Sequence, residues 1–381
     1  MSTTTAETPA AELPGLDRPF LFAAVLGTAV LVALAWLDGH PASAALVILG
    51  FGLGAAFLKT EFSFTAGWRR FLVKGEAGGM LGALLLTAVA ALVIVPVAAL
   101  VPGFGGAIAP IGPSLVIGAF VFGIGMQLAN GCGSGTLYTA GGGSGRMLIA
   151  LALFIAGSVI GSLHLPAFLR LGGIDPVLAS DYFGPWGGLA VTLASIAAAA
   201  LLIVAFARSR GANFKPRPLI IVGAVAIGGL SIGVFLAGHH PWSVTFGFTV
   251  WGAKLAALGG ADFSGAEFWQ WPGPKRALAE SILSDTSSLT DLGMILGAMA
   301  AAAATKPFAR TAWPPARSLL AAAIGGLLMG WGARIGFGCN IGAFFGGVAS
   351  GSLHGWIWFA AALGGCLIGI RLRPLFGLSR D

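Results

Sequence analysis

Charged side chains are scarce in this chain of 381 residues. Asp, Glu, Lys and Arg together make up 9% of it, against roughly 25% in a typical soluble domain. Hydrophobic residues make up 57%, which leaves too little polar surface to cover a soluble fold of this size. The composition therefore excludes a soluble enzyme, a disordered protein and a nucleic-acid binder whose cations contact phosphates. It predicts an all-α polytopic membrane protein.

Cysteine is equally rare, with three residues in the whole chain. Three cysteines are too few for a disulfide framework. The sequence also lacks a phosphate loop, a dinucleotide fingerprint and an HExxH motif, and the spacing of its five histidines is not that of a metal site. We therefore expect no cofactor, no metal centre and no use of ATP by this chain.

The sequence contains several long stretches without Asp, Glu, Lys or Arg. A helix needs about 20 residues to cross a bilayer. The uncharged stretches are 19–37, 39–58, 77–145, 147–169, 182–207, 218–253, 292–305 and 335–370. Most of them fit one or two spans. Basic residues divide almost equally between the two sides of a nine-span arrangement, so the positive-inside rule leaves orientation open, and eleven spans remain an alternative.

Two motifs recur in the same order in both halves of the chain. Residues 123–136 read GIGMQLANGCGSGT and residues 330–343 read GWGARIGFGCNIGA, while FSFTAGW at 62–68 resembles FSGAEFW at 263–269. The recurrence predicts an internal duplication. The expected divisions are a disordered tail at 1–18, a first repeat at 19–170, a linker with a central span at 171–217, a second repeat at 218–373 and a tail at 374–381.

The first glycine-rich motif predicts a broken helix. Glycine clusters at 131–135 and 141–145 cannot belong to one straight helix. We expect a helix that enters the membrane, unwinds at Cys132 and turns back. Irregular backbone at membrane depth is tolerated only where protein shields it or where it lines a wet cavity. Cys339 occupies the equivalent position in the second half.

Two broken elements that meet inside a duplicated bundle are typical of a transporter's substrate path. Helix ends at the breaks favour anions, and glycine lets a ligand approach the backbone. A thiol adds a polarizable, weak donor that suits a sulfur-bearing anion. Asparagines flank both cysteines and either donate to substrate or cap the backbone. The candidate substrate-binding residues are Cys132, Cys339, Gln127, Arg334, Asn130, Asn340, Gly131, Gly133 and Gly338.

Each candidate also has a purely structural interpretation. An isolated cysteine is usually a small buried hydrophobe, and we keep that interpretation for Cys366. Two cysteines at equivalent breaks favour function. Arg334 lies inside an apolar stretch, whereas Lys254 either serves function or extends to the interface. We expect all 14 acids in tails, loops or span edges, and cations without intramembrane acids fit an anion pathway.

The paired motifs NGCGSGTLYTAGGGSGR and GFGCNIGAFFGG, inside a duplicated apolar chain, resemble the YeeE/YedE family of bacterial inner-membrane proteins. That family is associated with uptake of thiosulfate and related sulfur compounds, and some members with selenium metabolism. The resemblance implies nine spans, re-entrant broken helices and two inverted structural repeats. It also implies a relay in which thiosulfate passes between the thiols of Cys132 and Cys339, and a soluble sulfurtransferase or persulfide carrier as partner.

The chain departs from this family at one segment. Thiosulfate-type members carry a further cysteine in an FCF-like segment, where this sequence has Phe62-Ser63-Phe64, with Ser264 as the expected counterpart. Ser63 and Ser264 join the candidate substrate-binding residues, and the expected substrates widen to related sulfur or selenium anions. Alternative functions are a membrane enzyme that forms a cysteine persulfide, a selenium-compound transporter, a soft-metal permease and a passive pore.

Overall fold

The structure is a computed structural model that describes residues 15–37, 41–305 and 314–381. Helices dominate these ranges, and two isolated bridges, Ile111 with Ile174 and Leu178 with Ser352, are the β-type pairings found there. The expected tail at 1–18 lies mostly outside the described residues, and the first helix already begins at Arg18. The all-helical prediction is therefore confirmed for the described part of the chain.

Nine helical stretches in the described ranges are long and apolar enough to cross a bilayer. They are α1 (Arg18–Leu37), α2 (Pro41–Thr60) continued by α3 (Phe64–Lys74), α4 (Gly78–Leu100), α5 (Pro113–Ala129) continued by α6 (Gly133–Gly141), α7 (Gly145–Leu169), α8 (Ala179–Ser209), α9 (Pro218–Gly238), α13 (Ala316–Ile335) continued by η3 (Asn340–Phe345) and α14 (Gly346–Ala349), and α15 (Leu353–Leu372) continued by η4 (Arg373–Phe376). This agrees with the predicted polytopic membrane protein.

A connected group of shorter elements lies between α9 and α13 along the chain. These elements are α10 (Val244–Leu258), η1 (Glu267–Gln270), α11 (Pro272–Ala279), η2 (Ile282–Ser284) and α12 (Thr286–Ala303). The longest, α12, begins with polar Thr and Ser residues and packs between α2 and α1. The predicted span near 286–305 corresponds to α12, a helix of the bundle that is not among the nine candidate spans of the described ranges.

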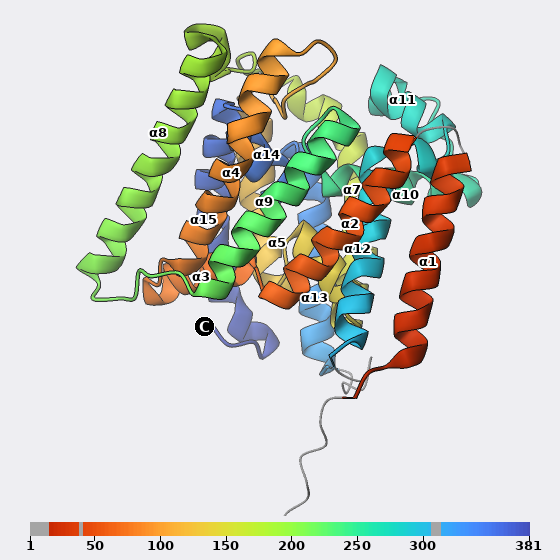
Figure 1. Ribbon diagram of the computed structural model, residues 1–381, viewed down its shortest axis with the longest axis horizontal. Coiled ribbons are helices and arrows are strands. Elements are labelled where there is room, and N and C mark those ends of the chain that lie inside the picture. The colour runs from red at the N-terminus through yellow and green to blue at the C-terminus, as the bar shows by residue number, and fades with distance from the viewer. Residues whose placement is uncertain (1–14, 38–40, 306–313) are drawn as a thin grey trace, which may run out of the picture.

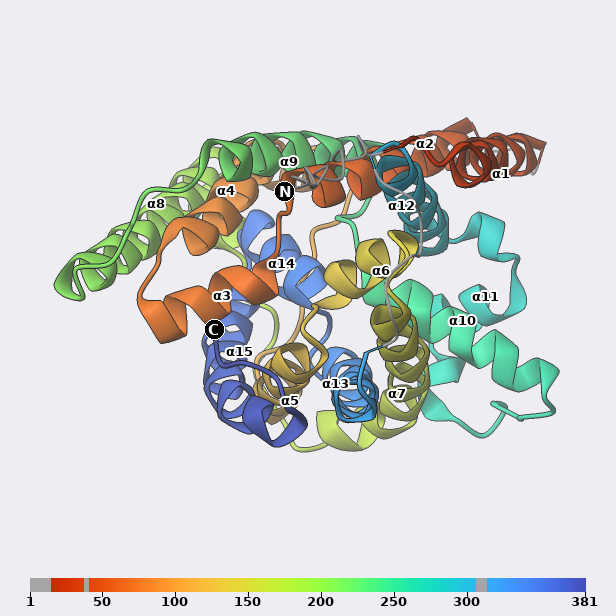
Figure 2. The same ribbon diagram turned by 90° about the horizontal axis from the view of Figure 1, so that it is seen from below.

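Helix packing follows the same scheme in the two halves. The helix α5 packs against α15 as α7 packs against α13, and α2 packs against α12 as α4 packs against α9. At the edges, α1 contacts α12 and α8 contacts α4. Figure 2 shows α8, α9, α2 and α1 in one row, with α15, α5, α13 and α7 gathered on the other side. The inverted orientation of the halves stays a prediction.

Glycine brings helix backbones into direct contact. A β-carbon added at Gly297 of α12 would lie 1.9 Å from the carbonyl oxygen of Phe51 in α2. Without a hydrophobic force between helices inside a bilayer, such close van der Waals packing is a principal source of helix association. Much of the high glycine content therefore serves packing. The short helices α6 and α14 end up inside the ring of longer helices, as Figures 1 and 2 show.

Candidate functional site

The first break lies where the sequence predicts it. The helix α5 ends at Ala129, Asn130 has a left-handed backbone with φ 64°, and α6 starts at Gly133. Cys132 is the N-cap of α6, and its Sγ accepts a hydrogen bond from the Gly135 N–H at 3.3 Å. The sulfur therefore occupies the position where a helix N-terminus attracts negative charge.

The second break has a different geometry. After α13, Gly338 adopts φ 150°, and a β-carbon there would lie 2.7 Å from the Ala343 nitrogen, so only glycine fits. Cys339 then precedes η3, a π-helix over Asn340–Phe345. π-helical turns are rare and occur frequently at functional sites. The chain thus unwinds at both cysteines, but α6 is an α-helix and η3 is a wider turn.

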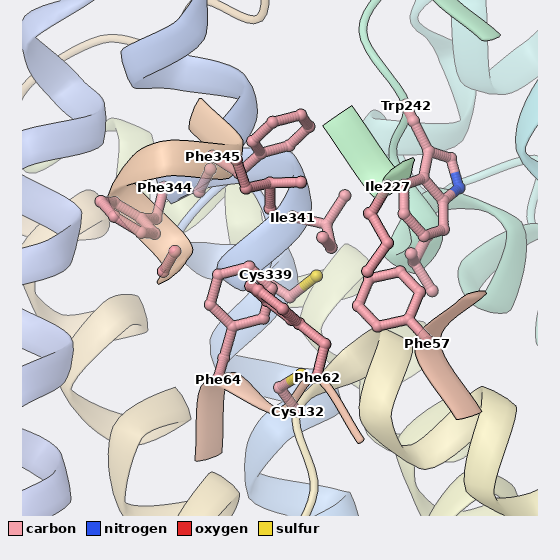
Figure 3. Close-up of a cluster of buried hydrophobic side chains, with 14 of the residues drawn as sticks. Phe57, Phe62, Phe64, Cys132, Ile227, Trp242, Cys339, Ile341, Phe344 and Phe345 are labelled. Atoms are coloured by element: carbon pink, nitrogen blue, oxygen red, sulfur yellow. The ribbon is translucent and has the colours of Figure 1, made fainter. Parts of the chain in front are cut away.

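The two cysteines meet inside the molecule. A β-carbon added at Gly133 would lie 2.9 Å from the Sγ of Cys339, which brings that sulfur to the residue next to Cys132. Both cysteines are buried, and Figure 3 shows their sulfurs in one cluster. The Thr65 hydroxyl lies within reach of the Cys132 thiol. Thr245 contributes a methyl group at the same Gly133 position, 3.4 Å from the added carbon.

Apolar side chains enclose the pair of sulfurs. The enclosing residues labelled in Figure 3 are Phe57, Phe62, Phe64, Ile227, Trp242, Ile341, Phe344 and Phe345. Aromatic rings contact one another along this wall, for example Phe57 stacked on Tyr138 with ring centroids 5.4 Å apart. A dry wall strengthens the few polar interactions inside it, because the local dielectric constant is low.

Several buried polar atoms near the cysteines lack any hydrogen-bond partner in the described structure. Asn340 is fully buried, and neither its Oδ1 nor its Nδ2 is bonded. The Oγ1 atoms of Thr65, Thr136 and Thr245 are also unpaired. A buried polar group without a partner costs about 1–3 kcal/mol, so such groups need an explanation, and a bound polar ligand is one.

Gln127 and Asn130 lie at the end of α5 and contact arginines. The Oδ1 of Asn130 accepts hydrogen bonds from Arg69 at 2.7 Å and from Arg373 at 3.3 Å. The Oε1 of Gln127 accepts from Arg69 at 3.5 Å, and its backbone oxygen accepts from Arg373 at 2.6 Å. Asn130 therefore positions guanidinium groups and caps α5, two residues before Cys132.

A third arginine supports the same helix end. Arg146 donates to the carbonyl oxygens of Leu128, at 2.7 Å, and of Ala129, and to the Ser318 hydroxyl at 2.9 Å. Helix C-termini leave carbonyl oxygens without intrahelical partners, and cations stabilise that end of the helix dipole. Three guanidinium groups thus converge close to the first break, where anions are attracted.

The two predicted intramembrane cations take different positions. Arg334 lies at the end of α13, and its guanidinium carbon is 5.7 Å from the ring centroid of Phe246 and 5.6 Å from that of Phe268. Such cation–π contacts stabilise a buried charge, and the Arg334 Nε has no hydrogen-bond partner. Lys254 donates to the backbone oxygens of Leu278 at 2.8 Å and Glu280 at 2.5 Å, so Lys254 caps the end of α11.

The two predicted serines do not occupy equivalent places. Ser63 is the N-cap of α3, with its Oγ 3.2 Å from the Ala66 nitrogen, and it lines a cavity of about 200 Å³ that also holds Arg70, Lys215 and Arg217. Ser264 is exposed, and its hydroxyl donates to Asp262 at 2.7 Å. Ser264 is part of a local turn.

Sequence reasoning missed the segment that does resemble Ser63 in position. Ser243 precedes α10 as Ser63 precedes α3. The signal was present, because WSVTFG at 242–247 repeats the pattern of FSFTAG at 62–67. In each motif a threonine follows two residues after the serine, and these threonines, Thr65 and Thr245, are the ones that reach the cysteine pair.

The expectation for the acids was wrong at one position. Asp291 is fully buried, in the second turn of α12. The apolar stretch that defined the span starts at residue 292, but α12 already begins at Thr286 and lies among α1, α2, α6 and α10. Asp291, at the edge of the hydrophobic run, therefore lies inside the protein and not at its surface.

Comparison with known proteins finds a family model and several relatives. A family model described as sulphur transport matches residues 59–368. The chain is 36% identical over 159 residues to the probable transporter YedE of Escherichia coli strain K12, covering 41% of this chain and 38% of that protein. It is 29% identical over 264 residues to the thiosulfate transporter TsuA of Spirochaeta thermophila, covering 64% and 72%. TsuA of Escherichia coli strain K12 is 27% identical over 326 residues, covering 82% and 89%.

Proposed function

This chain belongs to the sulphur transport family, and on that premise we propose that it carries a small sulfur-containing anion, thiosulfate or a near relative, across a bacterial inner membrane. One observation carries the proposal: the Cys339 sulfur lies against Gly133, next to Cys132, so that one thiol from each motif lies inside the same apolar cluster. The matched relatives named TsuA, thiosulfate transporters by name, support the substrate class.

The proposed relay passes the anion from the Cys132 thiol to the Cys339 thiol. Each S–H is a weak, polarizable donor, which suits the outer sulfur of thiosulfate better than it suits a hard oxyanion. Gly133 next to Cys132 has no side chain, which lets the Cys339 sulfur approach the backbone beside the first thiol. The unpaired amide of Asn340 and the unpaired hydroxyls of Thr65 and Thr245 supply stronger hydrogen bonds to the oxygen end of the substrate.

Entry of an anion is favoured at the Ser63 side. The cavity at Ser63 holds three cationic side chains, Arg70, Lys215 and Arg217, beside two acids, Glu61 and Glu76. Arg69 of the same helix faces the opposite way, toward the end of α5. Arg217 lies 3.7 Å from Glu61, and the cavity keeps an excess of one positive charge, which raises the local concentration of anions. We propose that anions gather here before they reach Cys132.

The serine at position 63 widens the set of proposed substrates. A hydroxyl keeps a short donor at this entry but lacks the soft sulfur of the family's FCF-like segment. Selenium analogues therefore belong among the candidates, together with other sulfur anions. Competition between labelled thiosulfate and unlabelled sulfite, selenite or selenosulfate ranks them directly. A soluble sulfurtransferase or persulfide carrier that accepts the delivered sulfur is the partner we propose on the cytoplasmic side.

Uptake of [³⁵S]thiosulfate tests the function, in a sulfur-auxotrophic host whose other importers are deleted. The variants Cys132→Ala and Cys339→Ala should each lower the initial rate about tenfold or more, as expected when a residue that contacts the transported ion is removed. The matched control is Cys366→Ala, a buried thiol in the unbroken helix α15, which should stay within about twofold of wild type.

Three outcomes would contradict the proposal or favour a rival. Undiminished uptake in both cysteine variants would reject the relay, and uptake that ignores both thiol substitution and membrane potential would favour a passive pore. A stable mass adduct on either thiol without transport would favour a persulfide-forming enzyme. Protein levels in the membrane, measured for every variant, separate a loss of transport from a loss of folding.

A further inference from the structure

Asp291 is the buried charge that the proposed anion path does not explain. It is the acidic side chain with no exposed surface within the described ranges, and both its Oδ1 and Oδ2 lack a hydrogen-bond partner. An ionised carboxylate held in an apolar interior without partners is very unfavourable. A buried carboxyl group without hydrogen-bond partners is therefore a candidate functional group, and intramembrane acids commonly serve as proton relays.

The helix α10 connects Asp291 to the cysteine pair. Thr245 and the Cys339 sulfur both lie against Gly133. Two residues after Thr245 in α10, a β-carbon added at Gly247 would lie 2.9 Å from the Oδ2 of Asp291. A single short helix segment, 245–247, therefore touches the thiol pair at one end and the carboxyl group at the other.

Trp242 belongs to the apolar cluster and also lies near Asp291. Figure 3 shows the Trp242 ring in the wall around the two sulfurs, with its nitrogen turned away from them. The indole N–H acts on the Asp291 carboxyl group without forming a hydrogen bond of normal geometry. A small rearrangement would complete that bond when the carboxyl group loses its proton.

Other ionisable groups near Asp291 are few. The nearby charges that act on it are those of Asp285, at the start of α12, and of the Cys339 thiol when ionised. The helices packed against α12 carry Arg18 in α1, Lys59 in α2, Tyr138 in α6 and Lys254 in α10. Lys254 is bonded to the end of α11. None of these side chains forms an ion pair with Asp291 in the described structure.

We propose that Asp291 is the proton-binding residue that couples anion movement to proton movement. This inference rests on the proposed transport function and adds its energy source. An anion beside Cys339 and an ionised Asp291 repel each other strongly in a dry interior. Protonation of Asp291 therefore favours anion binding at Cys339, and anion binding favours protonation by the same factor.

The proton balance is simple. Asp291 takes a proton from the aqueous phase on the side where the anion enters, and the carboxyl group becomes neutral while the anion occupies the space at Cys339. When the anion leaves on the other side, the carboxyl group releases that proton there. A proton fits this site better than Na⁺, because Na⁺ needs several oxygen ligands, whereas an indole N–H and the backbone at Gly247 adjoin this carboxyl group.

Transport by the purified full-length protein in liposomes tests the coupling. An inward proton gradient of about one pH unit should raise the steady-state accumulation of [³⁵S]thiosulfate about tenfold when one proton moves with each anion, because about 1.4 kcal/mol of driving force changes an equilibrium ratio tenfold, and a protonophore should abolish the increase. Asp291→Asn, a permanently neutral isostere, should lose the response to pH while thiosulfate exchange without a gradient continues. Asp175→Asn, an exposed acid, is the matched control and should respond like wild type.

A second measurement uses the wild-type protein alone. A pH-sensitive dye trapped in the liposomes should report acidification when thiosulfate is added outside, and no acidification when sulfate is added. Wild-type uptake without acidification, or an Asp291→Asn variant that still responds fully to pH, would overturn the coupling. A response to a Na⁺ gradient instead would also overturn it. Absence of thiosulfate exchange in wild type would refute the transport function itself, which is a different result.

Discussion

At the residue scale, the candidate site depends on a residue without a side chain, Gly133, and on a buried amide without a hydrogen-bond partner, Asn340. Gly133 has no side chain where the Cys339 sulfur lies, and the Asn340 amide has no partner in a fully buried position. Both features cost stability. The first lets the two broken elements approach closely, and the second keeps hydrogen-bonding capacity for a ligand beside the thiols.

Gly133→Ala should close the space between the thiols. The new β-carbon would lie 2.9 Å from the Cys339 sulfur, so the thiol has to move aside, and thiosulfate uptake should fall about tenfold or more, as small displacements at a reacting or binding centre do. Gly229→Ala in α9 is the matched control, because nothing lies within 4 Å of its added carbon. Equal uptake rates for the two variants would show that the substrate does not pass Gly133.

Asn340→Leu should separate stability from transport. Leucine has the same branching and removes two unpaired polar atoms, so the free energy of unfolding in detergent should rise by about 1–2 kcal/mol, whereas thiosulfate uptake should fall. Asn130→Leu is the contrast, because Asn130 has partners and a positive φ, and that change should lower stability. A less stable Asn340→Leu protein with normal uptake would contradict the assignment.

At the scale of elements, the breaks in α5–α6 and α13–η3 determine where the thiols lie. The glycine cluster at 131–135 is a strong breaker, and the break that it predicts at Cys132 lies between the end of α5 at Ala129 and the start of α6 at Gly133. The π-helix after Cys339 gave no comparable signal, because AFFGG fits an α-helix as well. Its wider turn comes from packing within the bundle, which local sequence does not encode.

The serine segments show the same limit. Matching FSF to FSG paired Ser63 with Ser264, since the letters agree, but the shared role belongs to the serine that starts a short helix. Asp291 was missed for a related reason: hydropathy places a span's edge at the first charge, whereas burial depends on the neighbouring helices. The cysteine pair, by contrast, was predictable because duplication and glycine breaks both pointed to it.

Arg146 holds the end of α5, and its loss should weaken the whole element. Arg146→Met removes charged hydrogen bonds to the oxygens of Leu128 and Ala129 and leaves both buried carbonyls unpaired, which should cost about 3 kcal/mol. Thermal unfolding in detergent measures the change. Arg371→Met, at an exposed position, should shift the unfolding temperature little, and equal shifts for both variants would refute the capping role.

At the scale of the whole molecule, each half needs the other for its packing. The helices α5 and α7 of the first half pack against α15 and α13 of the second, and α2 packs against α12. Helices with large faces left open toward lipid lose the close backbone contacts that hold a membrane bundle together. The fold is therefore one interlocked body, and the internal duplication stays a prediction.

Splitting the chain between residues 175 and 176 tests this interdependence. Fragments 1–175 and 176–381 expressed together should assemble and restore thiosulfate uptake, because the cut falls in the connection before α8 and leaves the helix pairs intact. Either fragment alone should be degraded and give no uptake. Stable accumulation of one fragment by itself, detected by immunoblot of the membrane fraction, would show that a half folds independently.

The π-helical turn after Cys339 would make the two directions along the proposed anion path unequal. If the halves are related by inversion and were identical, an ion arriving from either face of the membrane would meet the same groups in the same order. An α-helix, α6, follows Cys132, whereas a wider π-helix, η3, follows Cys339. An anion moving inward and an anion moving outward would therefore meet different surroundings at the first thiol that each contacts. If the proposed relay operates, influx and efflux should therefore differ in their intrinsic rates.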